Sequence, residues 1–198
     1  MKLFFIGITG GSGSGKTALA RELKKYFGKR ALIFHIDNYQ KFGEKLPEIK
    51  GGMKNWDHPG AIKWERMIKD LLSLKGGETI TVKSRDQKKL KRVKEKTLRP
   101  SEIIIIEGYF LFYKSSIRKL LDFSVFLKAN EEIRIKRRTK PKNIEYVQKI
   151  LLPMHNKYIE PTKKFADLIL NTEKLSIERC VKKIISYGRK ISKNKKDC

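Results

Sequence analysis

A glycine-rich segment near the N terminus has the composition of a phosphate-binding loop. It matches the pattern G-x-x-x-x-G-K-[ST] with the consecutive residues Gly10, Gly11, Ser12, Gly13, Ser14, Gly15, Lys16 and Thr17. Small residues let successive backbone N–H groups turn inward around an anion, the lysine can reach the β and γ phosphates, and the threonine hydroxyl can bind Mg²⁺. The loop stands between an apolar run and a helical pattern, which favours phosphate binding over a simple chain reversal. Motors, switches and kinases share this loop, so it does not by itself identify the reaction.

Acidic residues follow two of the apolar runs at the points where predicted strands end. Asp37 follows the run at residues 32–36, and Glu107 follows the run at residues 103–106. The carboxyl ends of parallel strands lie beside the ligand site, so both side chains should face the phosphate loop. Phosphoryl transfer needs a group that orients the attacking hydroxyl and groups that hold Mg²⁺, and we predict Asp37 as the base and Glu107, with Thr17, at the metal. A turn-forming role for Asp37 and a strand-end cap for Glu107 are the alternatives.

Basic residues recur on a predicted helix at residues 131–138. Arg134, Arg137 and Arg138 are three and four positions apart, so they should share one helix face and could close over a triphosphate. A run of solvated charges is the alternative, because basic residues are common throughout the chain.

Alternating strands and helices are expected to position these residues. Apolar runs predict strands at residues 2–8, 31–36, 79–82, 103–106, 123–127 and 166–170, and helical patterns follow the phosphate loop and cover residues 61–74, 131–138, 144–158 and 176–191. This order implies right-handed crossovers and a parallel sheet. We therefore predict an α/β fold of the P-loop NTPase type, a three-layer α/β/α arrangement with a mostly parallel five-stranded sheet. A single domain over residues 1–198 is expected, with a short basic tail at about residues 189–198.

The charge of the chain is strongly positive, with a formal net value of +26. Lysine and arginine neutralise phosphates, so a nucleotide-regulated protein that binds nucleic acid is an alternative function. The charge is spread along the chain, however, and its two concentrations at residues 83–96 and 189–196 contain no interleaved aromatic residues. A surface for stacking bases is therefore not indicated, and nucleic acid is not an expected partner.

No apolar run approaches the roughly 18 residues of a membrane-spanning helix, and the first residues do not resemble a cleavable signal. Cys180 and Cys198 are too few for a disulfide framework and lack metal-ligand spacing. We therefore expect a cytoplasmic protein with no membrane partner.

Five segments together resemble the uridine kinase and phosphoribulokinase family of P-loop kinases. They are the phosphate loop and residues 35–39 (HIDNY), 55–59 (NWDHP), 106–108 (IEG) and 152–167, which contain LPMH and EPTKKFAD. Their order and spacing match the family over most of the chain, and the NWDHP and EPTKKFAD elements are more specific than the loop alone.

The resemblance implies an ATP- and Mg²⁺-dependent kinase, with GTP as an alternative donor, that phosphorylates a small molecule such as uridine or cytidine. It implies that Asp37 takes the proton of the accepting hydroxyl, that Tyr39 lines the acceptor site, and that Asp57 binds acceptor hydroxyls. Trp56 could stack on an acceptor ring or pack in the core. The implied catalytic residues are Asp37, Lys16, Glu107, Arg134 and Arg138, and Arg137 joins the phosphate loop in binding ATP.

Two stretches depart from the pattern of uridine kinases. Where those enzymes carry a Tyr-Asp and a His-Ser-Arg that hold the pyrimidine, this chain has residues 85–92 (RDQKKLKR), which retain only Asp86 and Arg92 as candidates. The stretch at residues 138–143 is shorter and lacks an Arg-Gly-Arg segment. Arginine in place of tyrosine favours an anionic or strongly polar acceptor, so another polyol, nicotinamide riboside or a sugar phosphate is the alternative substrate. A homo-oligomer is left open.

Overall fold

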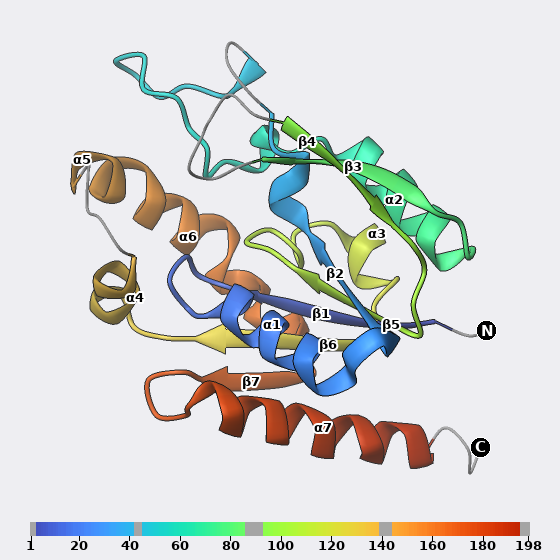
Figure 1. Ribbon diagram of the computed structural model, residues 1–198. Coiled ribbons are helices and arrows are strands. Elements are labelled where there is room, and N and C mark those ends of the chain that lie inside the picture. Colours follow the sequence, from blue (N-terminus) through green and yellow to red (C-terminus); the bar gives the residue numbers. More distant parts are fainter. Residues whose placement is uncertain (1–2, 42–44, 86–92, 139–143, 195–198) are drawn as a thin grey trace.

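The computed structural model describes residues 3–41, 45–85, 93–138 and 144–194 (Figure 1). Its centre is a five-stranded sheet with the order β2-β5-β1-β6-β7. The strands are β1 (Phe4–Gly10), β2 (Ala31–His35), β5 (Ile103–Glu107), β6 (Phe123–Lys128) and β7 (Leu168–Asn171). Every neighbouring pair is parallel, which confirms the predicted sheet.

The interior strand β5, next to the middle strand β1, is buried along its whole length, as its run of isoleucines predicts. It pairs with β1 on one side and β2 on the other, and both registers meet at Glu107, which lies opposite Ile8 and His35. Ile8, Glu107 and His35 therefore lie side by side, and β1 continues for two residues beyond them. The residues that follow the three strands emerge at the same edge of the sheet.

Two apolar clusters cover the two faces of the sheet. On one face, α1 (Lys16–Phe27) and α7 (Ile177–Asn194) lie together and pack through residues that include Leu19, Leu23 and Ile184. On the other face, α2 (Trp64–Lys75) contributes Met67 and Leu71, and α3 (Ser115–Arg118) also packs there. Helices on both faces of a parallel sheet form the predicted three layers.

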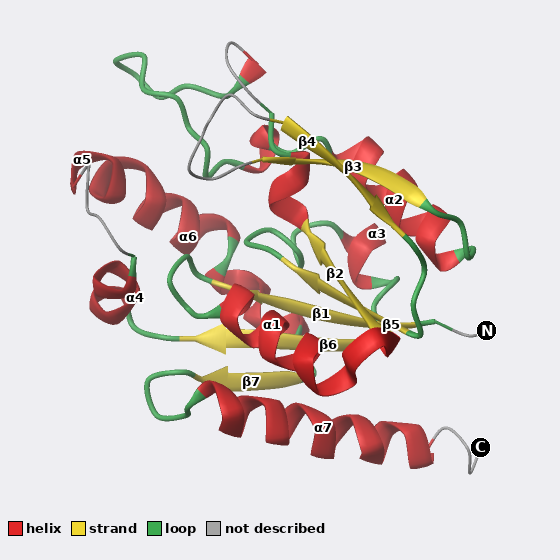
Figure 2. Ribbon diagram, in the orientation of Figure 1, coloured by secondary structure: helices red, strands yellow, loops and turns green. Residues whose placement is uncertain are grey.

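An antiparallel hairpin of β3 (Ile80–Arg85) and β4 (Val93–Leu98) lies apart from the main sheet (Figure 2). The sequence predicted β3, but residues 93–98 appeared only as part of a basic stretch. Their pattern is weak because charged residues follow one another and Leu98 alone among residues 95–98 is buried. Pairing with β3, where Ile80 lies opposite Leu98, makes this segment a strand.

The remaining helices follow β6. They are α4 (Glu131–Arg137), α5 (Ile144–Tyr146) and α6 (Leu152–Tyr158), and a π-helical turn (Val147–Leu151) joins the last two. Helix α7 continues to Asn194, so most of the expected basic tail is helical and residues 195–198 lie outside the described part. Within the described ranges, no helix is both long enough and apolar enough to cross a membrane.

Candidate active site

The glycine-rich loop joins β1 to α1 in a tight turn, in which the main-chain N–H of Ser14 donates to the main-chain oxygen of Gly11. Gly13 and Gly15 have φ angles of +82° and +96°, a left-handed conformation that favours glycine. A Cβ atom at Gly13 would lie 2.2 Å from the main-chain oxygen of Arg134, and one at Gly11 would lie 2.5 Å from the Nη1 atom of the same arginine. The loop therefore rests on α4 with no space for larger residues, as a cradle for phosphate oxygens requires.

Lys16 lies at the start of α1 and folds over the loop. Its Nζ atom donates hydrogen bonds to the main-chain oxygens of Gly10 and Gly11, at 3.1 and 3.0 Å. Burial lowers the pKa of Lys16, while the charges of Glu107 and Asp37 act in the opposite direction. The ammonium group thus lies among the groups that would surround a bound phosphate.

Thr17 and Glu107 meet below the loop, at the carboxyl end of β5. The Thr17 hydroxyl donates to Oε1 of Glu107 at 3.2 Å, and the same oxygen lies 2.7 Å from Nδ1 of His35. Burial acts to raise the pKa of Glu107, but the hydrogen bond from His35 and the charge of Lys16 outweigh it, so this pKa lies below its ordinary value. Glu107 is therefore an anion.

An ionised carboxylate beside a hydroxyl is an oxygen donor set suited to Mg²⁺. Within the part of the chain that the structure describes, no group of three or more histidine, cysteine, aspartate or glutamate side chains could hold a metal ion. Thr17 and Glu107 would instead share the ion with phosphate oxygens and water, which is how proteins usually bind Mg²⁺ with a nucleotide.

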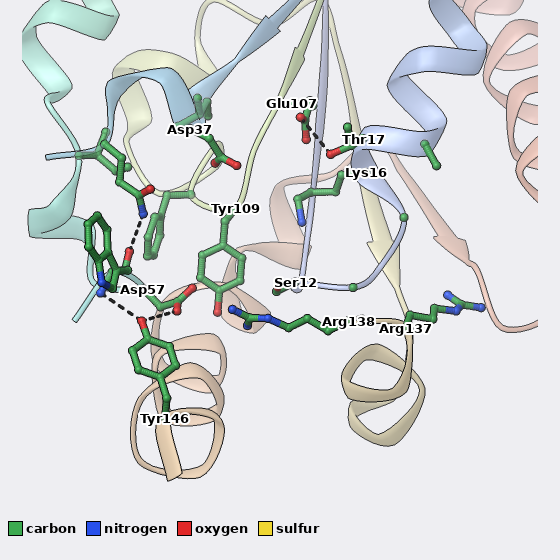
Figure 3. Close-up of a pocket in the computed structure, with 18 residues that line it drawn as sticks. Ser12, Lys16, Thr17, Asp37, Asp57, Glu107, Tyr109, Arg137, Arg138 and Tyr146 are labelled. Atoms are coloured by element: carbon green, nitrogen blue, oxygen red, sulfur yellow. Dashed lines mark hydrogen bonds between the residues drawn. The ribbon is translucent and has the colours of Figure 1, made fainter. Parts of the chain in front are cut away.

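A cavity of ≈ 840 Å³ opens from the loop and ends at two aspartates (Figure 3). Asp37 and Asp57 point into it from one side, and Lys16 and Thr17 from the other. Although the Asp37 side chain is exposed to the open cavity, desolvation by the surrounding protein, followed by the charge of nearby Glu107, raises its pKa. Asp37 is therefore a better proton acceptor than an ordinary aspartate, as a general base requires.

A short 3₁₀ turn (Ile36–Tyr39) aims Asp37 at the cavity. Side chains three positions apart are eclipsed in such a turn. Ile36 and Tyr39 are both buried, and Asp37 and Gln40 line the cavity, which Ile36 also borders. The hydroxyl of Tyr39 donates to Oδ2 of Asp70 at 2.7 Å. Tyr39, which the family resemblance placed at the acceptor, therefore lies in the core and is not among the described residues that line the cavity.

Replacing Tyr39 with Phe should lower stability and leave the acceptor site intact. Among the described residues, the variant leaves the buried Asp70 with an ion pair to Arg66 at 3.0 Å, so the free energy of unfolding should fall by about 1–3 kcal/mol. The KM for the acceptor should stay within about twofold of the wild-type value. Chemical denaturation and steady-state kinetics measure the two effects, and a large rise in KM with unchanged stability would return Tyr39 to the acceptor site.

Asp57 is held at the far end of the cavity by several neighbours. Its main-chain N–H donates to Oδ1 of Asn55 at 3.1 Å, and its Oδ2 atom accepts the hydroxyl of Tyr146 at 2.8 Å. Trp56 also lines the cavity, and its main-chain oxygen accepts from Nε2 of Gln40 at 3.1 Å. The loop that carries Asp57 is thus tied to the 3₁₀ turn after β2 and to α5.

The three arginines expected on one helix face point in different directions. Arg134 is buried beneath the phosphate loop and donates from Nε to the main-chain oxygen of Ala129. Arg137 lines the cavity and bonds Thr172 through both terminal nitrogens. Arg138 follows the last residue of α4 and extends toward Asp57 (Figure 3). The three side chains diverge because α4 ends after Arg137 and packs directly against the loop, but Arg137 and Arg138 both line the cavity. Their action on a triphosphate stays a prediction.

Arg138 differs from the other two in its bonding. Its Nη1 atom is buried and has no hydrogen-bond partner among the described residues. Its charge lowers the pKa of Asp57, although burial is the larger influence and raises it. An unpaired guanidinium nitrogen in a cavity beside a phosphate loop suits a phosphate oxygen.

Sequence reasoning assigned no role to several residues that line the cavity or contact its carboxylates. They are His35, Gln40, Tyr109, Phe110 and Tyr146. Tyr109 follows Gly108, and its ring lies between the aspartates and Lys16 (Figure 3). Its position directly after Ile106-Glu107-Gly108, at the end of a predicted strand, could have indicated that it lines the site. The sequence around Tyr146 gives no such indication, because its contact with Asp57 joins segments 89 positions apart. The predicted acceptor residues Asp86 and Arg92 lie outside the described residues.

Comparison with known proteins agrees with this geometry. The model of the phosphoribulokinase / uridine kinase family matches residues 5–176. The chain is 35% identical to the uridine kinase of Clostridium perfringens over 195 residues, covering 91% of this chain and 94% of the relative. It is 36% identical to the uridine kinase of Macrococcus caseolyticus over 182 residues, covering 85% and 88% of the two chains.

Solved structures share the fold. A possible uridine kinase from Bacillus stearothermophilus superposes with a TM-score of 0.67 at 23% identity, covering 86% of this chain and 89% of that one. Phosphoribulokinase from Rhodobacter spheroides gives a TM-score of 0.62 at 14% identity, with coverage of 86% and 70%. These likenesses confirm the predicted P-loop architecture. By the family match and these relatives, the chain belongs to the phosphoribulokinase / uridine kinase family and is a kinase.

Proposed function

We propose that this kinase transfers the γ-phosphoryl group of ATP, with Mg²⁺, to the 5′-hydroxyl of a nucleoside such as uridine or cytidine. The observation that carries the proposal is the single cavity shared by the phosphate loop, Asp37 and Asp57. Relatives of at least 35% identity named uridine kinase support a nucleoside as the acceptor. The same reading treats residues 1–198 as one kinase domain that acts on a small molecule.

In this proposal the residues of the chain divide between donor and acceptor. The loop N–H groups and Lys16 bind the phosphates, and Thr17 and Glu107 hold the metal. Bound Mg²⁺ supplies charge neutralisation at the phosphate oxygens. Asp37 accepts the hydroxyl proton while the oxygen–phosphorus bond to the acceptor forms and the bond to the leaving diphosphate breaks. Arg138 supplies a positive charge toward which the phosphoryl oxygens can turn.

Asp57 is proposed to bind the hydroxyl groups of the acceptor. A carboxylate accepts hydrogen bonds only, so an ionised Asp57 selects molecules that carry donors at this point. Trp56, Tyr109 and Phe110 supply apolar surface around it, which suits a ring attached to a polyol. An acceptor that lacks the hydroxyl would leave the carboxylate unpaired.

An acceptor panel tests this function. ADP formation should require Mg²⁺ and increase on addition of uridine or cytidine, and 2′-deoxyuridine should lose on the order of tenfold to hundredfold in kcat/KM. The panel should include GTP as donor, nicotinamide riboside and sugar phosphates. Stimulation by sugar phosphates alone would replace the nucleoside with an anionic acceptor. A wild-type enzyme that forms no acceptor-dependent ADP with any of these compounds would contradict the proposal.

A further inference from the structure

Tyr146 connects two neighbouring residues of the acceptor loop. Its hydroxyl donates to Oδ2 of Asp57 at 2.8 Å and accepts from the main-chain N–H of Trp56 at 3.1 Å (Figure 3). The two contacts define the direction of the phenolic proton, because the N–H of Trp56 can only donate. The proton therefore points to Asp57.

The backbone around Tyr146 explains how the side chain reaches this place. Tyr146 ends α5, and the chain continues at once into the π-helical turn Val147–Leu151. A π-helical turn displaces the residues before it relative to those after it, and such turns are frequent at functional sites. On the far side of the turn Ile150 and Leu151 are buried, whereas Tyr146 lines the cavity.

The surroundings keep the phenol neutral. Burial, followed by the charge of Asp57, raises the pKa of Tyr146. A neutral hydroxyl remains a donor at every pH at which the enzyme would be assayed. The Tyr146 hydroxyl donates to Oδ2 of Asp57 and makes no hydrogen bond to Oδ1.

We propose that Tyr146 is a positioning residue that fixes the carboxylate of Asp57 for recognition of an acceptor hydroxyl. The inference rests on the proposed role of Asp57 and adds a residue that does not touch the reacting atoms. Tyr146 sets which carboxylate oxygen faces the acceptor, and it stabilises the ionised form that accepts hydrogen bonds.

The pH dependence of acceptor binding gives a readout that a merely structural role would not change. Burial raises the pKa of Asp57, whereas the hydrogen bond from Tyr146 and the charges of Arg138 and Lys16 lower it. Tyr109 and Asp37 also interact electrostatically with Asp57. Loss of the Tyr146 hydroxyl removes one lowering influence and leaves the others, so the pKa of Asp57 rises.

The Tyr146→Phe variant tests the proposal. The KM for the acceptor should rise about tenfold, whereas kcat and the KM for ATP should stay within about twofold of the wild-type values. The acidic limb of kcat/KM for the acceptor should move to higher pH, because Asp57 must be ionised to accept. An unchanged acceptor KM and an unchanged acidic limb would overturn the proposal.

Tyr158→Phe is a matched control at the end of α6. Its hydroxyl lies 3.4 Å from Nε2 of His58, and it does not line the cavity. The control should leave the acceptor KM and the acidic limb unchanged, and an equal effect in both variants would attribute the result to helix packing and overturn the proposal.

A crystal structure of Tyr146→Phe without ligand separates this inference from the proposed function. The Asp57 carboxylate should leave its wild-type orientation, and an unchanged orientation would overturn the positioning role whatever the acceptor is. An acceptor panel that fails for the wild-type enzyme contradicts the proposed function and does not affect this measurement.

Discussion

Replacement of Asp37 by Asn should lower kcat by about three orders of magnitude and leave the affinity for ATP within about twofold of the wild-type value. The amide has nearly the same shape as the carboxylate but cannot take the hydroxyl proton. Asp37 lies at the acceptor side of the cavity, so the donor should still bind. Steady-state kinetics and nucleotide titration measure the two quantities.

The pH profile adds a second expectation for the same residue. Because desolvation and the charge of Glu107 raise the pKa of Asp37 in the free enzyme, the acidic limb of the wild-type kcat/KM should lie above the ordinary aspartate value of about 4. Ionised Asp37 costs stability at neutral pH, since a raised folded pKa weakens the fold as the pH rises through it. Asp37→Asn should therefore unfold at no lower a temperature than the wild-type protein.

Asp57→Asn provides the contrast within the same cavity. Its main effect should be a higher KM for the acceptor, because an amide at this point binds hydroxyl donors less strongly than a carboxylate. Turnover by Asp37→Asn at the wild-type rate would remove Asp37 from the mechanism. Equal losses of kcat in the two variants would contradict the division of their roles.

Replacement of Gly13 by Ala should reduce the affinity for ATP by about 100-fold. The added methyl group would lie 2.2 Å from the main-chain oxygen of Arg134, so the loop or α4 must move. A displaced loop can no longer aim its N–H groups at the phosphates, and the loss of one or two hydrogen bonds to a charged group, about 1.5–3 kcal/mol each, lowers affinity by roughly two orders of magnitude. Equilibrium nucleotide titration measures the loss directly.

Gly77→Ala is the matched control for this loop. Gly77 has a φ angle of +87°, close to the +82° of Gly13, but a Cβ atom there would meet nothing within 4 Å. In both variants the left-handed conformation should lower the free energy of unfolding by about 1 kcal/mol. Only Gly13→Ala should also bind nucleotide less tightly. ATP binding by Gly13→Ala at the wild-type level would show that the loop does not hold the phosphates.

Much of the candidate site was predictable because its signals are local. The phosphate loop is a continuous segment whose glycines are needed for its own backbone shape, and Lys16 and Thr17 follow directly from it. Asp37 and Glu107 could be expected at one edge because each follows an apolar strand, and parallel strands end together. The sheet and its covering helices were predicted for the same reason, since burial on both faces leaves long apolar runs in the sequence.

Other features depend on contacts between distant segments. Tyr146 contacts Asp57, which lies 89 positions earlier in the chain, and a π-helical turn follows it directly. Tyr39 turned inward because a 3₁₀ turn aligns it with Ile36, and Asp70 on α2 was present to accept its hydroxyl. Neither the contact of Tyr146 with Asp57 nor the burial of Tyr39 produces a periodic pattern in the sequence.

The arginines of α4 show the same division between local sequence and tertiary structure. Their spacing alone predicts a common helix face, but Arg134 packs under the phosphate loop, Arg137 binds Thr172, and Arg138 lies beyond the last helical residue. The sequence by itself therefore determined the phosphate loop, the strand-end carboxylates and the parallel sheet, because backbone geometry and burial act over neighbouring residues. Only the tertiary structure decided which polar side chains face the cavity, because each such choice depends on a partner supplied by another element.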